Sequence, residues 1–513
     1  MALPTLPDTA RGSIALYTGA VLLLFYFVTS LHRRWSQYRF AKEHGCKPIP
    51  AFPIYDPFFA LDRLFFMVKA AKARKVLETN ALRYTQLGDT FRAQRITTPV
   101  IMTREPQNVK TILSLKFHDY SLGDRLKVFG PLLGQGIFTS DGEDWSRSRH
   151  MIRPNFVKDQ VAHLDIFEEL MDDLFALIPT DGSTVDLQDL FFGYTIDSAT
   201  EFLFGHNVRS LKKRRSGVVD NEPDFPKAFN YSLDNIVMNS RLGALMFLHR
   251  DSKAVEANRI CHDMVGQFVD KAMRVREKYD EEKAAGETEE GRRYLFLNGL
   301  AQQTGDRTRI RDELMNVLLA GRDTTASLLS NMFFMLAKHP EVWAKLQEEV
   351  AFLEGRGPTY EELRNLKYVK FCLNESLRLH PVVPLNSRTA IKDTVLPVGG
   401  GADGRSPVFV PKGTIVGYSP WAMHRRKDYF GPDAEEFRPD RWADLRPGWE
   451  YLPFNGGPRI CVGQQYALTE AAYVTTRLAQ RYSVLEGRDP GPWEESLTLT
   501  LSSYNGTKVS LRH

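Results

Sequence analysis

Cysteine is scarce in this chain, and its cysteines lie far apart. Only 4 of the 513 residues are cysteines, and no two of them form a CxxC pair. This spacing argues against a disulfide framework and against a structural zinc site, and it fits a reducing compartment. The four residues are Cys46, Cys261, Cys372 and Cys461.

A strong charge imbalance is also absent. The 67 lysines and arginines nearly balance the 63 aspartates and glutamates, which leaves a formal net charge of +4. Bulk electrostatics therefore give no reason to expect nucleic acid as a partner. The chain also has no internal repeat and no GxGxxG motif that joins a predicted strand to a helix. We therefore expect one large domain without a flavin or nicotinamide module of its own.

One long uncharged run stands near the N-terminus, at residues 13–31. With a rise of about 1.5 Å per residue, a helix of this length nearly spans a hydrocarbon core of about 30 Å. A cleaved signal peptide is the alternative, but the run is longer than its usual apolar region and no small-residue cleavage site follows. The 5 basic residues between positions 33 and 47 outnumber Arg11, which predicts that the long C-terminal part is cytosolic.

The distribution of apolar, basic and proline residues along the chain predicts four segments. Residues 1–12 are a short lumenal N-terminus, 13–31 a transmembrane helix, 32–57 a basic and proline-rich linker, and 58–513 one large domain. In that domain apolar residues recur at three- and four-residue spacing, while strand-like runs are few and short. The expected fold is therefore mainly α with small β-sheets. The clearest helical patterns cover 163–178, 258–285, 309–340 and 341–355.

The stretch FNGGPRICVG, residues 454–463, places one cysteine among glycines in front of a helical pattern. A sulfur at a helix N-terminus is favoured as thiolate, and Arg459 adds positive charge. Glycines let the backbone approach a flat or bulky partner closely. A small buried hydrophobe is the alternative for Cys461. No histidine pair is arranged for nucleophilic catalysis, so the pattern favours a metal ligand, and haem iron in particular.

This stretch fills the pattern F-x-x-G-x-R-x-C-x-G, which resembles the haem-binding loop of cytochromes P450. The matched positions are Phe454, Gly456, Arg459, Cys461 and Gly463. The resemblance implies haem b as the cofactor, with Cys461 as the axial thiolate ligand and with Phe454 and Gly456 at the haem. It also implies that residues 58–513 are the catalytic domain of a monooxygenase with the cytochrome P450 fold.

A second segment, AGRDTTA at 320–326, puts an acid and two threonines inside the longest helical pattern. A solvated polar patch is the alternative, but the flanking sequence is too apolar for a solvated helix. Buried polar groups need partners or a function. The segment resembles the family's oxygen-activation groove, so the resemblance implies that Thr324 assists dioxygen activation and that Asp323 relays protons.

Two further sets of residues resemble family motifs. Glu375 and Arg378 stand at i, i+3 and can pair; with Arg441 they resemble a structural Glu–Arg–Arg network, although alone they would pass for a surface pair. Haem propionates need cations, and arginine suits carboxylates. The resemblance therefore assigns propionate binding to a second set, Trp145, Arg149, Arg388 and Arg459. For each of these arginines, an ordinary surface location is the alternative.

The resemblance also implies partners and a location. Electrons would come from a separate NADPH-cytochrome P450 reductase, with cytochrome b5 as a second candidate donor. Basic residues near Cys461 would dock the reductase's acidic surface. The chain would sit in the endoplasmic reticulum membrane as a single-pass protein with a cytosolic catalytic domain.

The expected substrate is a lipophilic small molecule. The chain is most similar to the fungal branch that hydroxylates n-alkanes and fatty acids, so we expect hydroxylation at or near a terminal carbon. A tailoring monooxygenase for polyketides or terpenoids is the alternative. A peroxide isomerase or dehydratase and a non-catalytic membrane haem protein fit the intact Asp323–Thr324 pair less well. The candidate residues of the substrate pocket wall are Phe129, Phe138, Leu319, Val383 and Leu499. For each of them, packing in the core is the alternative.

Overall fold

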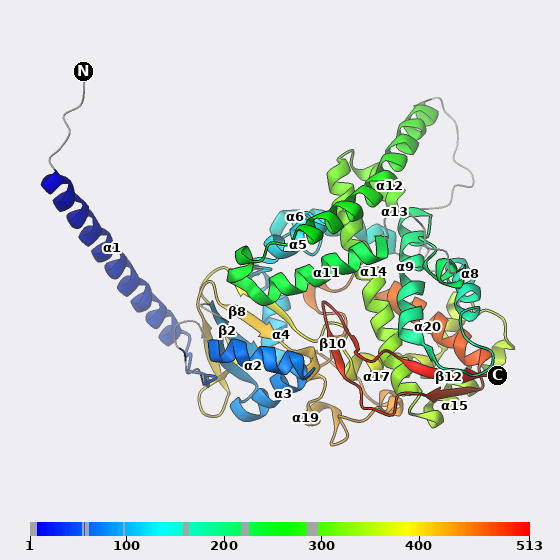
Figure 1. Ribbon diagram of the computed structural model, residues 1–513. Helices are drawn as coiled ribbons and strands as arrows, with labels where there is room; N and C mark the ends of the chain where they lie inside the picture. The colour runs from blue at the N-terminus through cyan, green and yellow to red at the C-terminus, as the bar shows by residue number, and fades with distance from the viewer. Residues whose placement is uncertain are drawn as a thin grey trace.

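A computed structural model describes residues 8–53, 56, 61–95, 98–156, 164–216, 225–284 and 296–513. The first helix, α1 (Asp8–Glu43), projects away from the rest of the protein, as Figure 1 shows. Within it, Leu16–Glu43 is long and apolar enough to cross a membrane, and its most apolar window is 0% buried. Apolar side chains without a protein partner are consistent with membrane anchoring.

Helix α1 differs from the sequence expectation in one respect. It contains the predicted membrane segment 13–31, but it continues through the basic residues to Glu43. The first part of the expected linker is therefore helical, and the prolines prevent helix formation only beyond Glu43. The proline-rich part is tied to the domain, because the N–H of Phe52 donates to Arg92 O at 2.8 Å and the N–H of Arg92 donates to Pro50 O at 2.7 Å.

Helices make up most of the large domain, and all four predicted helical patterns are confirmed. In α8, for example, Phe167, Leu170, Met171 and Leu174 fall on one face and are buried. The described helices besides α1, α14 and α20 are α2 (Leu61–Lys72), α3 (Val76–Leu87), α4 (Pro106–Lys110), α5 (Arg125–Leu133), α6 (Gly142–Ile152), α8 (Asp165–Phe175), α9 (Leu187–Phe204), α10 (Ser210–Ser216), α11 (Phe225–Leu242), α12 (Ser252–Ala284), α13 (Phe296–Gln303), α15 (Pro340–Val350), α16 (Tyr360–Asn365), α17 (Lys367–Leu379), α18 (Pro420–Met423) and α19 (Lys427–Phe430).

The sheets are small, as the sequence predicts. The largest has five strands in the order β1-β2-β8-β5-β3. Strands β2 and β8 pair in parallel, and the other neighbours pair antiparallel. The strands are β1 (Thr90–Arg95), β2 (Thr98–Thr103), β3 (Tyr120–Ser121), β4 (Val185–Asp186), β5 (Asn386–Ala390), β6 (Thr394–Gly400), β7 (Ser406–Val410), β8 (Ile415–Tyr418), β9 (Val484–Gly487), β10 (Glu495–Leu497), β11 (Leu501–Ser503) and β12 (Lys508–Arg512).

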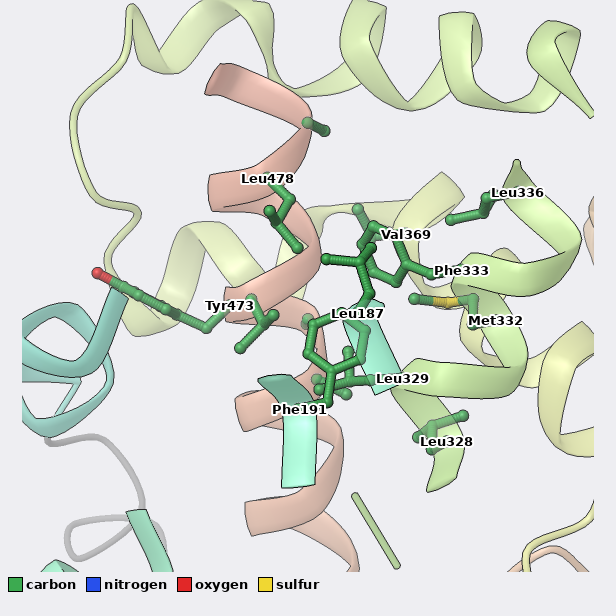
Figure 2. Close-up of a cluster of buried hydrophobic side chains, with 14 of the residues drawn as sticks. Leu187, Phe191, Leu328, Leu329, Met332, Phe333, Leu336, Val369, Tyr473 and Leu478 are labelled. Carbon is green, nitrogen blue, oxygen red and sulfur yellow. The ribbon is translucent and has the colours of Figure 1, made fainter. Parts of the chain in front are cut away.

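The centre of the domain is α14 (Arg307–Leu336), which is buried on nearly every side. Asp306 caps its N-terminus by accepting the N–H of Arg309 at 3.1 Å. Figure 2 shows its C-terminal half in an apolar cluster with α9, α17 and α20 (Gln464–Arg481). Because α14 is buried on nearly every side, other elements enclose it, and it can form one wall of a cavity. The labelled members are Leu187, Phe191, Leu328, Leu329, Met332, Phe333, Leu336, Val369, Tyr473 and Leu478.

Candidate active site

A cavity lies between α14 and the chain segment that leads into α20; we call it the central cavity. Side chains from α5, α6, α9, α14 and β5 also line it. The predicted site residues that line it are Trp145, Arg149, Arg388, Arg459, Phe454, Thr324, Cys461, Phe138 and Val383. A set of residues far apart in the sequence thus meets around one space.

Cys461 faces this cavity from the loop in front of α20. The loop is held by its own backbone, because the N–H of Cys461 donates to Phe454 O at 3.0 Å. Helix α20 begins at Gln464, so the predicted position of the cysteine just before a helix is confirmed. Burial raises the pKa of the Cys461 thiol, while the N–H of Gly463 and the guanidinium of Arg149 lower it. The thiolate is the form that binds a metal, and the Gly463 N–H and Arg149 favour it. The Cys461 side chain is itself exposed toward the cavity.

Two details of this loop differ from the sequence analysis. The charge that lowers the pKa of Cys461 belongs to Arg149, whereas Arg459 was expected in that role. Gly456 does not line the cavity: a Cβ there would lie 2.8 Å from the ring of Trp449. Gly457, with φ of +68°, leaves room for the carbonyl of Leu113. These two glycines therefore let the loop pack against its own protein, and the assignment of Gly456 to the cofactor stays a prediction.

Four arginines converge on the cavity: Arg125, Arg149, Arg388 and Arg459. Arg388 is buried, and its side chain donates to neutral oxygens, at 2.7 Å to Ser387 O and at 3.3 Å to Asn386 Oδ1. Among the ion pairs of the described residues, only Arg459 of these four has a carboxylate partner, Asp141 at 2.7 Å.

The arginines disfavour one another's charge. Burial, with Arg388 nearby, lowers the pKa of Arg125 to about 10. Burial likewise lowers the pKa of Arg459 to about 10, with Arg388, Arg125 and Arg149 adding to the effect against Asp141. Arg388 is buried and the other three are half-buried, and such an excess of positive charge around one cavity calls for an anionic ligand. No aspartate or glutamate is among the described residues that line the cavity. The site thus fits a large apolar ligand that carries carboxylates and binds a sulfur, as haem does.

Helix α6 supplies the predicted aromatic partner. Trp145 and Arg149 stand at i, i+4 on this helix, so both side chains reach the cavity. The guanidinium of Arg459 lies 4.5 Å from the centroid of the Trp145 ring, and Arg149 donates to Ile460 O at 3.0 Å. Helix α6 is thereby attached to the cysteine loop through both residues.

Thr324 and Asp323 lie differently. Thr324 lines the cavity and its hydroxyl donates to Ala320 O at 2.6 Å, within the helix. Asp323 does not line the cavity; its carboxylate pairs with Arg322 at 2.7 Å, and both side chains are buried. Burial raises the pKa of Asp323, and Arg322 lowers it. The acid of the predicted pair is therefore held behind the cavity wall.

The Glu–Arg–Arg network is formed as predicted. Glu375 is fully buried and receives two hydrogen bonds from Arg378, both at 2.9 Å. Arg441 Nε and Trp442 Nε1 each donate to it at 2.9 Å. Arg378 also donates to the carbonyls of His424 and Ala434. None of the three predicted residues lines the cavity, so their role is structural.

Three of the five predicted pocket walls are not among the residues that line the central cavity, and their role at the substrate stays a prediction. Leu319 is buried in a core cluster with Leu318 and Met315, and Phe129 and Leu499 pack against the same cluster. Phe138 and Val383 line the cavity. The sequence pattern marks an apolar residue but does not say which apolar neighbour it meets. The apolar lining includes several residues that the sequence analysis missed, namely Ile137, Phe156, Phe202, Leu203, Val317, Leu328 and Val382.

Asn316 is a second functional candidate that the sequence analysis missed. It lines the cavity, accepts the N–H of Phe138 at 3.0 Å, and donates to Leu133 O at 2.9 Å. One turn earlier, Asp312 accepts the N–H of Gln135 at 2.8 Å. These two side chains of α14 therefore hold the loop that brings Phe138 to the cavity. A buried asparagine in an apolar helical pattern was the available signal.

Comparison with known proteins agrees with this site. A family model described as Cytochrome P450 matches residues 60–507. The chain is 52% identical to cytochrome P450 monooxygenase himC of Aspergillus japonicus, over 91% of this chain and 84% of that protein. It is 46% identical to cytochrome P450 monooxygenase fsdH of Fusarium heterosporum, over 98% and 90%. It is 42% identical to cytochrome P450 52A5 of Candida maltosa, over 95% and 94%.

The chain therefore belongs to the cytochrome P450 family. Its fold, its cavity with a cysteine on one side, and its relatives define a monooxygenase that uses haem with a cysteine thiolate as axial ligand. Enzymes of this family accept electrons from redox partners and bind lipophilic substrates.

Proposed function

We propose that this monooxygenase hydroxylates a long aliphatic substrate, an n-alkane or a fatty acid, at or near its terminal carbon. The observation that carries the proposal is the apolar lining of the central cavity, which includes Phe138, Leu203, Val317 and Val382. Such a surface binds a hydrocarbon chain by burial of apolar area. The similarity to the 52A group of yeast cytochromes P450 supports the same substrate class.

The chain's own residues would divide the work as follows. Bound haem would supply the oxygen-activating chemistry. Cys461 would hold its iron, and Phe454 would line the loop beside it. The four cavity arginines would pair with its carboxylates, beside the ring of Trp145. Arg125, which the sequence analysis did not include, joins this set because its guanidinium shares Asn386 with Arg388, at 3.1 Å and 3.3 Å.

Thr324 and Asp323 would serve proton supply from different depths. The Thr324 hydroxyl is at the cavity and can accept a hydrogen bond there while it donates to Ala320 O. Asp323 must first release Arg322 before its carboxyl can exchange protons with the cavity. Asp323 would therefore donate a proton only while its ion pair with Arg322 is open, and it would not line the cavity otherwise.

Membrane attachment suits a lipophilic substrate. Residues 13–31 would cross the endoplasmic reticulum membrane once, with residues 1–12 in the lumen and the catalytic domain in the cytosol, tethered through residues 32–57. NADPH-cytochrome P450 reductase would supply electrons from the same membrane, with cytochrome b5 as a second donor. The unpaired apolar surface of α1 supports the anchor.

The test is reconstitution of the full-length chain with reductase and NADPH, and incubation with a panel of n-alkanes and fatty acids. The reduced protein must first show the red-shifted carbon monoxide band of thiolate-ligated haem. We expect hydroxylated products from at least one chain length. No turnover of any member by protein with that band would overturn the proposed substrate class, and a spin shift with a polyketide or terpenoid instead would select the tailoring role.

A further inference from the structure

Tyr418 is a buried side chain at the central cavity that none of the roles above uses. It is the last residue of β8, the middle strand of the five-stranded sheet. Its backbone is paired on both sides, opposite Thr103 of β2 and Asn386 of β5. The residue is 1% exposed and lines the cavity. Strand pairing therefore holds Tyr418 at a fixed place in the cavity wall.

The hydroxyl of Tyr418 reaches the cysteine loop. It donates a hydrogen bond to Asn455 Oδ1 at 2.9 Å. Burial raises the pKa of Tyr418, while Arg388 and Arg125 lower it. A tyrosine with a pKa above its ordinary value of about 10 keeps its proton at neutral pH. The hydroxyl is therefore a permanent donor, and the amide oxygen of Asn455 is its acceptor.

Asn455 belongs to the loop that presents Cys461, and it lines the cavity as well. Its φ of +62° is a left-handed conformation, which asparagine tolerates better than most residues. Its Nδ2 donates across the loop to Arg459 O at 3.5 Å. The residue before it, Phe454, accepts the N–H of Cys461. The amide of Asn455 thus joins the start of the loop to the residues just before the cysteine.

Tyr418 also lies beside the cavity arginines. Asn386, its partner across the strand pair, accepts hydrogen bonds from Arg125 at 3.1 Å and from Arg388 at 3.3 Å. One end of β8 therefore lies between the arginines that suit carboxylates and the loop that carries the sulfur. A left-handed residue keeps its conformation when the surrounding structure holds it, and Tyr418 supplies such a hold to Asn455 from a rigid sheet.

We propose that Tyr418 is a positioning residue for the axial ligand, because its hydroxyl, through Asn455, holds the cysteine loop in the conformation that presents Cys461 to the cavity. Tyr418 fixes the amide of Asn455, and this amide fixes the left-handed turn at the start of the loop. Tyr418 does not touch the sulfur and acts only through Asn455. The inference rests on the binding of haem by a cysteine thiolate and is independent of the substrate class.

The first test measures how firmly the thiolate is held. The full-length, haem-loaded protein is incubated in moderate urea, and loss of the red-shifted carbon monoxide band is followed in time. Tyr418→Phe removes only the hydroxyl, so the band should disappear about 2-fold to 12-fold faster, as expected for one net hydrogen bond. Tyr194→Phe is the matched control: Tyr194 is also fully buried and donates to Phe167 O at 3.1 Å, but it does not line the cavity. Equal rates for the two variants would overturn the proposal.

The second test asks whether Tyr418 acts through Asn455. Asn455→Gly removes the amide and keeps the backbone free to adopt positive φ, so this variant should also lose the band faster than the native protein. Addition of Tyr418→Phe to Asn455→Gly should cause no further acceleration. Effects that multiply in the double variant would refute the link. If Tyr418→Phe does not fold, Asn455→Gly alone decides, and a native rate in that variant would overturn the proposal.

The third test observes the ligand itself. Resonance Raman spectra of the iron–sulfur stretch are recorded without substrate for the native protein, Tyr418→Phe and Tyr194→Phe. We expect a shift to lower frequency in Tyr418→Phe and the native frequency in Tyr194→Phe. An unchanged frequency in Tyr418→Phe would show that Tyr418 supports only the fold and would overturn the proposal. Because these measurements need no turnover, they remain decisive even if no alkane or fatty acid is hydroxylated.

Discussion

Replacement of Glu375 by glutamine isolates the contribution of the Glu–Arg–Arg network. The change keeps the size of the side chain and removes its charge. The native carboxylate accepts bonds at 2.9 Å from Arg378, Arg441, Trp442 and the N–H of Arg438. A glutamine amide turns one of the two acceptor oxygens into a donor that faces other donors.

The magnitude follows from burial. The side chains of Glu375 and Arg378 are both 0% exposed, and that of Arg441 is 4% exposed. Removing one partner of a buried ion pair leaves a charge without compensation and costs about 3–5 kcal/mol. At about 1.4 kcal/mol per factor of ten, the unfolding equilibrium shifts by roughly two to three and a half orders of magnitude. The second arginine places the expected value toward the upper part of this range.

Urea unfolding of the haem-loaded protein, followed by tryptophan fluorescence, measures the change as a lower midpoint at unchanged slope. Glu256→Gln is the matched control, because Glu256 and Arg259 are also a Glu–Arg pair at i, i+3, with side chains 56% and 60% exposed. We expect no measurable change there, since exposed pairs contribute little. Equal midpoints for Glu375→Gln and Glu256→Gln would refute the assignment of a buried network as a main support of the fold.

Two further predictions concern the cavity loop and the pH dependence of stability. Asn316→Ala removes the hydrogen bonds to Phe138 and Leu133, so the substrate KM should rise and hydroxylation should spread over more carbons. The carbon monoxide band should stay unchanged. An unaltered product distribution would contradict the role of Asn316 in holding the loop of Phe138. Burial raises the pKa of Asp197 to about 6, above about 3.9 in the unfolded chain, so the folded state binds more protons between these values. Stability should fall by up to about 3 kcal/mol as pH rises through this window, and Asp197→Asn should show no such loss in the same urea titration.

Much of the fold and part of the site could be predicted because their signals are local. The four long helical patterns need only the spacing of apolar residues along one segment. The loop that presents Cys461 is likewise contiguous, and its position before α20 is confirmed. The pairing of Glu375 with Arg378 follows from spacing on one helix, and Arg441 was added by resemblance.

The expectations that differ from the structure concern contacts between distant segments. Leu319 and Val317 are equally apolar in the sequence, but only Val317 reaches the cavity. Which of the two does so depends on the rotation of α14 against α9 and the cysteine loop, and no local pattern contains that angle. The surroundings of Gly456 differ from the expectation for a related reason. A glycine in the sequence indicates that another group packs closely against the backbone, and only the three-dimensional structure shows that this group is the ring of Trp449.

The same distinction applies to a carboxyl group. Asp323 is visible in the sequence because it stands beside Thr324 on one helix, yet its carboxylate is engaged by Arg322. Thr324 lines the cavity, whereas Asp323 does not. Access of this acid to the cavity is therefore a property of the helix packing, which the spacing of residues along one helix does not contain.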